Sequence, residues 1–83
     1  MNKYLIIIEK SETGYSAYSP DLPGCVSTGT TLVNTEANMK EAIEFHIEGM
    51  IEEGIEIPKP LTKAAEFISI PTKRTRNRSL VTA

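Results

Sequence analysis

Few residues in this sequence have side chains suited to catalysis or to metal binding. His46 is the only histidine and Cys25 the only cysteine. A general base needs a group that orients it, and no aspartate or serine stands where it would obviously do so for His46. Cys25 has no neighbouring base or helix N-terminus to lower its pKa. We therefore expect a half-buried His46, a structural Cys25, no enzyme activity, no cofactor and no metal site.

Carboxylates are more numerous, and four of them recur at helical spacing. These are Glu41, Glu44, Glu48 and Glu52. They would share one face of a helix, where a row of acids without apolar neighbours is usually a solvated surface. We expect this row to be a docking face for a basic partner. Asp21 lies in a proline-containing loop, where capping the turn is favoured over a direct functional contact.

The charge is distributed unevenly along the chain. The segment from Met1 to Thr72 carries five lysines and all eleven acids, a net charge of −6, whereas the last eleven residues carry +4. The basic residues of this tail are Lys73, Arg74, Arg76 and Arg78. An acidic body favours a basic partner. The tail is a candidate contact for nucleic acid, although a solvated, disordered terminus is the favoured interpretation.

Three short strands are predicted before the helix. Residues 3–9 are rich in β-branched side chains, residues 15–19 alternate strictly, and residues 25–28 form a third strand. Gly14 supplies a turn between the first two and is free to adopt a positive φ. The alternation places Tyr15 and Tyr18 on opposite faces, so at most one lies beneath the helix. Residues 20–24, with two prolines and a glycine, must interrupt the sheet.

A helix is predicted from Thr30 or Thr31 to Glu53. At steps of about 100° per residue, five apolar residues lie within about 80° of one another, Leu32, Met39, Ile43, Ile47 and Met50, with Val33 and Ile51 at the edge. Asn34 or Thr35 is the predicted N-cap, and Gly54 ends the helix. After a linker containing Pro58 and Pro60, residues 65–70 alternate again and predict a last strand. The order is therefore βββαβ, an α+β fold with one helix on one face of a three-to-four-stranded sheet.

Length and composition are consistent with one small cytoplasmic domain. Eighty-three residues bury a modest core, and one cysteine forms no intrachain disulfide. The longest apolar run near the start, residues 5–8, is far too short for a signal sequence or a membrane span. Oligomerisation, as a homodimer or larger, is the remaining common way to stabilise so small a domain.

The stretch from Gly14 to Pro60 resembles the HicB antitoxin family. The segments are GYSAYSPDLPGCVSTGTT and NMKEAIEFHIEGMIEEGIEIPKP. They contain the family's tyrosine-bearing second strand, its P-D-L-P-G-C turn, its G-x-T helix start, its E-A-I-x-x-H core and its G-x-x-I-P-x-P exit. The likeness covers about residues 1–70. It divides the chain into an antitoxin domain, residues 1–71, and a basic tail, residues 72–83.

This resemblance implies a partial ribonuclease-H-like fold and a partner. The partner would be a small basic HicA toxin, a ribonuclease that the antitoxin binds and masks. Many family members add a C-terminal DNA-binding domain; only twelve residues follow Pro71, too few for a helix-turn-helix, so operator binding is left open. The candidate toxin contacts are Tyr15, Tyr18, Pro20, Asp21, Leu22 and Pro23. The alternative is an orphan module that binds another protein or a nucleic acid.

Overall fold

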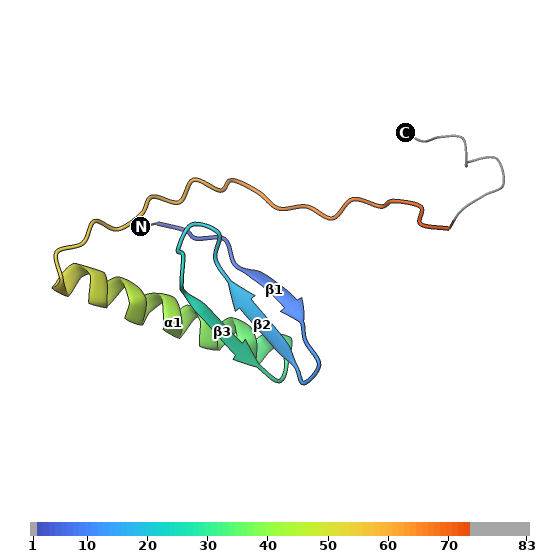
Figure 1. The fold of residues 1–83 in the computed structure, drawn as a ribbon, viewed down its shortest axis with the longest axis horizontal. Helices are drawn as coiled ribbons and strands as arrows, with labels where there is room; N and C mark the ends of the chain where they lie inside the picture. Colours follow the sequence, from blue (N-terminus) through green and yellow to red (C-terminus); the bar gives the residue numbers. More distant parts are fainter. Residues whose placement is uncertain (1, 74–83) are drawn as a thin grey trace.

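Within the part of the chain that the structure describes, three antiparallel strands and one long helix form the folded body (Figure 1). The structure is a computed structural model, and it describes residues 2–73. The strands are β1 (Ile7–Lys10), β2 (Tyr15–Tyr18) and β3 (Val26–Gly29), in the sheet order β1-β2-β3, and α1 spans Leu32–Glu52. The predicted βββα order is confirmed, although β1 begins four residues later than expected and β3 is shifted by one.

The hairpin of β1 and β2 sets which side chains meet the helix. The amide of Ser11 donates to the carbonyl of Gly14, and Ile8 stands opposite Ala17 in the ladder. Ala17 is buried, so alternation places Tyr15 on the same, helix-covered face and Tyr18 on the other. The prediction that the two tyrosines lie on opposite faces is confirmed.

The core lies between the sheet and α1. Its fully enclosed hydrophobic members come from a strand, the loop after β2, and the helix: Ala17, Leu22, Cys25 and Met39. Partly buried neighbours surround them: Tyr4, Ile6, Ile8, Ala42 and Ile43. Two turn hydrogen bonds, from the Leu22 amide to Ser19 and from the Cys25 amide to Leu22, fold the loop back. Burial of Leu22 stabilises the fold by about 2 kcal/mol.

The start of the helix differs from the prediction. Thr31 has an extended backbone, and its side chain accepts from the Asn34 amide, so Thr31 is the N-cap. Neither Asn34 nor Thr35 caps the helix. Thr35 is instead buried, and its hydroxyl donates to the Thr31 carbonyl at 2.7 Å. At the other end Gly54 has a φ of 71°, as expected of a glycine just beyond a helix.

Two glycines let the hairpin, β3 and the helix start approach one another closely. A Cβ on Gly29 would lie 2.5 Å from the Thr35 hydroxyl and 2.7 Å from the Thr35 amide nitrogen. A Cβ on Gly14 would overlap the carbonyl oxygen of Gly29. Gly14 does not have the positive φ that its place in a turn suggested. What both positions require is the absence of a side chain.

The predicted last strand is not part of the sheet. Residues 61–73 are extended, but none is assigned to a strand, and nearly all are exposed. Figure 1 shows the segment running past the sheet into solvent (orange). The alternating pattern of residues 65–70 predicts an extended conformation correctly, but a strand also requires a neighbouring edge, and the path set by the proline linker leads away from one.

Candidate protein-binding surface

The face of the sheet opposite α1 carries a row of apolar side chains from all three strands. Ile7 pairs with Tyr18, and Tyr18 pairs with Val26, so these three residues are adjacent across the sheet. Tyr18 is 39% exposed and Val26 is 66% exposed, whereas Ile7 is half-buried. An aromatic ring between two β-branched residues makes a stiff apolar surface that loses little entropy on binding. We call Ile7, Tyr18 and Val26 the open-face row.

The loop after β2 extends this surface at one end. Pro20 and Pro23 are exposed, and Gly24 has a φ of 84°, which reverses the chain before β3. Leu22, between them, is 1% exposed and belongs to the core. The sequence predicted Leu22 as a contact residue, but its buried side chain is not available to a partner. The loop is held in place by that buried leucine, and it presents the two prolines on its outside.

Asp21 has a role that the sequence did not indicate. One carboxylate oxygen accepts from the Thr62 amide at 3.0 Å and the other accepts from the Thr62 hydroxyl at 3.1 Å. The expected turn cap is thus replaced by a bond to a residue 41 positions further along the chain. A second tie lies nearby in sequence, from the Tyr4 hydroxyl to the Pro58 carbonyl. Together the two bonds attach the linker after α1 to the body.

Replacing Asp21 with alanine is expected to release the linker. Hydrogen bonds to a charged group contribute about 1.5–3 kcal/mol each, and partial exposure reduces this, so we expect a loss of about 1–2 kcal/mol in the free energy of unfolding. Amide hydrogen exchange at Thr62 should become markedly faster, with the β1–β2 ladder unaffected. Tyr4→Phe is the matched control, because it removes only the other tie. Unchanged exchange at Thr62 in Asp21→Ala would contradict this role.

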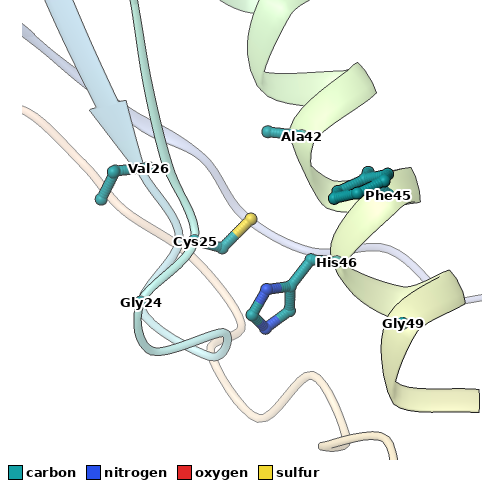
Figure 2. A pocket seen from close by; sticks show the side chains of 7 residues that line it. All are labelled: Gly24, Cys25, Val26, Ala42, Phe45, His46 and Gly49. Atoms are coloured by element: carbon teal, nitrogen blue, oxygen red, sulfur yellow. The ribbon is translucent and has the colours of Figure 1, made fainter. Parts of the chain in front are cut away.

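A shallow hollow of about 310 Å³ separates the start of β3 from the second half of α1. Figure 2 shows the Cys25 sulfur and the His46 ring on opposite sides of this hollow, with Phe45 on the helix above them. His46 is half-buried, as expected, and Cys25 is buried. Burial raises the pKa of the Cys25 thiol, which keeps it protonated near neutral pH. A protonated, enclosed thiol is a poor nucleophile, so the pair lacks the electrostatics of a catalytic Cys–His couple.

The Cys25 thiol is expected to react slowly with thiol reagents. At pH 8 the native protein should be labelled at least about tenfold more slowly than the chain in urea. Because the folded-state pKa is raised, the contribution of Cys25 to stability is complete below about pH 8.5 and declines as the pH rises through that raised value. Cys25→Ala should lack this alkaline decline. Equal labelling rates in buffer and urea would contradict the burial.

The helix presents the predicted acidic row to solvent. Glu41, Glu44, Glu48 and Glu52 are all exposed, on the side of α1 opposite the fully buried Met39. Phe45, 79% exposed, lies beside this row. An exposed phenylalanine next to acids can combine apolar contact with attraction for a basic surface. Phe45 was not among the contact residues predicted from the sequence.

Three further expectations concern metal sites, membrane spans and the basic tail. Within residues 2–73, no three potential ligands among histidine, cysteine, aspartate and glutamate come together as a metal site. No helix in the described part of the chain has the length and apolar character needed to cross a membrane. Lys73 is exposed, whereas Arg74, Arg76 and Arg78 lie outside the described residues.

Residues 4–79 match the family model of the HicB-like antitoxins of bacterial toxin–antitoxin systems. The chain belongs to that family. The match includes all three strands, the helix and the extended segment that follows it. The family resemblance inferred from the P-D-L-P-G-C turn and the proline-containing helix exit is thereby confirmed.

Individual relatives of this HicB-like chain agree with the assignment. It is 55% identical over 56 residues to a 14.9 kDa protein of Haemophilus phage HP1, a match covering 68% of this chain and 42% of the phage protein. It is 30% identical over 69 residues to Antitoxin HicB 2 of Photorhabdus laumondii, a match covering 83% of this chain and 50% of that antitoxin. The chain thus spans half or less of these two relatives. A chain of the HicA3 and HicB3 toxin–antitoxin complex matches with a TM-score of 0.65 and 37% identity, over 72% of this chain and 70% of the chain in the complex.

In this HicB-like chain, the predicted contact residues differ in how far they are exposed to solvent. Tyr18, Pro20 and Pro23 are exposed, and Leu22 is buried. Tyr15 is half-buried on the helix-covered face of the sheet, and Lys10 Nζ lies 5.2 Å from the centroid of its ring. Ile7 and Val26 of the open-face row were not predicted from the sequence. Predicting that Ile7 and Val26 lie beside Tyr18 requires the register between the strands, which the sequence did not specify.

Proposed function

We propose that this chain is an antitoxin that neutralises a HicA-type ribonuclease by binding the toxin and covering its RNA-binding surface, without catalysis of its own. Membership of the HicB-like family is the observation that carries the proposal. The structural similarity to a chain from a complex of HicA3 with HicB3 supports it, because 37% identity accompanies the shared fold. Residues 1–71 are the proposed binding domain.

The open-face row is the proposed apolar centre of the contact. Interfaces concentrate their binding energy in a few buried aromatic or aliphatic side chains surrounded by polar groups. Tyr18 fits that description, since Ile7 and Val26 flank it and exposed prolines lie at the end of the same strand. These neighbours are already ordered by the sheet and the loop, so little entropy is lost when they bind.

The acidic row on α1 supplies the proposed electrostatic attraction. Four exposed carboxylates on the outer side of α1, across the sheet from the open-face row, would attract a basic, RNA-binding protein over a distance. Such charges act mainly on the association rate, and salt screens them. Added salt should therefore slow association of the two proteins more than it speeds their dissociation.

Co-expression with the adjacent reading frame tests the proposal. A tag on this chain should recover the neighbouring protein in a stable complex. The neighbour expressed alone should arrest growth, and co-expression of this chain should restore it. A neighbour that neither binds nor harms the cell would contradict neutralisation and favour a binding module with another partner. In that case the tail, including Lys73, Arg74, Arg76 and Arg78, is the segment to test against nucleic acid.

A further inference from the structure

The extended segment after Thr62 exposes more apolar surface than a linker needs. Phe67 is fully exposed, and Ile68 and Ile70 are 75% and 66% exposed. Phe67 and Ile68 point to opposite sides of an extended chain, so both faces of this segment carry large apolar groups. A strand that is apolar on both faces is typical of one that is covered on both. We call residues 65–70 the free strand.

The sheet has an unoccupied position at β1. This strand is at an edge, and it has β2 as its only ladder neighbour among the described residues. Beside the chain leading into β1, a groove of about 960 Å³ opens between that chain and α1. Half of its lining residues are apolar (Tyr4, Ile6, Ile43, Ile47 and Ile57), and the other half are polar or charged (Asn2, Glu36, Lys40, Glu44 and Glu48). An edge with unpaired backbone groups next to a partly apolar groove is suited to receive another strand.

The opposite edge of the sheet is less accessible. The side-chain amide nitrogen Nδ2 of Asn38 on α1 donates to the Thr28 carbonyl of β3 at 2.9 Å. The helix also lies close to β3, because Gly29 lets the backbone of Thr35 approach. A side chain bonded to a strand carbonyl hinders a further strand from pairing at that point. Of the two edges, β1 is therefore the favoured acceptor.

The free strand does not reach the β1 edge of its own chain in this structure. The bonds from Tyr4 to Pro58 and from Asp21 to Thr62 fix where the segment leaves the body. Beyond Thr62 it runs past the sheet into solvent (Figure 1). The eight extended residues that follow Thr62, up to Ile70, reach about 26 Å, enough to lie along a strand of a second molecule.

We propose that two copies of this chain exchange their free strands, so that residues 65–70 of each copy pair with β1 of the other. Side chains from one face of the free strand would then cover the groove between the chain before β1 and α1. Because each copy both donates a strand and accepts one, the assembly closes as a two-fold dimer. This inference concerns a different partner from the proposed toxin, a second copy of the chain, although Ile7 of β1 and Glu44 and Glu48 of the groove also belong to the surfaces proposed for the toxin.

Sedimentation velocity with isotope-filtered NMR on the full chain tests the exchange. The wild-type chain should sediment as a dimer at about 50 μM and dissociate on dilution. In a mixture of 13C,15N-labelled and unlabelled protein, filtered NOEs should connect residues 65–70 of one copy with residues 4–10 of the other. Ile68→Pro should raise the dimer dissociation constant at least about tenfold, because proline removes a ladder donor.

Thr72→Pro is the matched control, since it adds a proline to the same exposed segment outside the free strand. It should leave the dimer intact. Circular dichroism should show that both variants keep the folded body, because neither residue contributes to the core. A monomeric wild type, NOEs confined to a single copy, or a dimer equally stable in Ile68→Pro would each overturn the proposal.

Discussion

Replacing Gly29 with alanine is expected to destabilise the domain by about 2–3 kcal/mol, the range typical of overpacking at a well-packed contact. The new methyl group would lie 2.7 Å from the amide nitrogen and 2.9 Å from the Cα of Thr35. Backbone atoms at a helix start are hard to displace, because Thr35 is buried and its hydroxyl is bonded to Thr31. Chemical denaturation would measure the loss as a lower midpoint at an unchanged slope.

Gly49→Ala provides the matched control within the same chain. Gly49 lies inside α1, and nothing lies within 4 Å of the position that a Cβ would occupy. Alanine is a better helix former than glycine by about 0.8–1 kcal/mol, so this variant should be more stable than the wild type. If both substitutions shifted the midpoint in the same direction, the close approach at Gly29 would not be the cause.

Tyr18→Ala is expected to weaken binding of the proposed toxin partner by about ten- to a hundredfold, a loss of about 1.4–2.8 kcal/mol. The ring is exposed at the centre of the open-face row, so its removal deletes the largest apolar side chain there. The folded domain should lose only about 1 kcal/mol or less, the size of cross-strand side-chain contributions. Isothermal titration with the purified toxin measures the affinity, and thermal denaturation measures the stability.

Val33→Ala is the control for that experiment. Val33 is 73% exposed and lies near the start of α1, on the other side of the sheet from Tyr18. Its truncation should leave toxin affinity within about twofold of the wild type. The contact role of Tyr18 would be wrong if its variant lost stability while the affinity of the remaining folded molecules stayed the same.

Elements with strong local patterns were predictable from the sequence. The helix has an apolar side centred on Met39 and a glycine just beyond its end, and both features are local. Alternation around Ala17 likewise placed the two tyrosines on opposite faces, but it did not identify which of them faces the helix. The N-cap was misplaced because several adjacent residues, Thr30, Thr31, Asn34 and Thr35, all have suitable side chains. Choosing among them requires the backbone angles.

Features that depend on distant residues were not predictable. Asp21 bonds to Thr62, 41 positions away, and no pattern in the sequence links the two. Leu22 was predicted to be a toxin contact, yet the loop folds back and buries it. The prediction that residues 65–70 form a strand of the sheet was wrong for the single chain, because alternation specifies an extended backbone but not a partner strand. The open-face row, the main part of the candidate site, required the register between three strands.

The two ties that hold the linker also affect the order in which the molecule folds. All contacts within the sheet and between the sheet and α1 involve residues before Gly54, and the strands follow one another through short connections. Such local topologies fold quickly, and this one is complete before Pro58 and Thr62 are needed. Docking of Pro58 on Tyr4 and of Thr62 on Asp21 joins residues that are 54 and 41 positions apart. During synthesis on the ribosome, the βββα body should therefore form first and the linker should dock last.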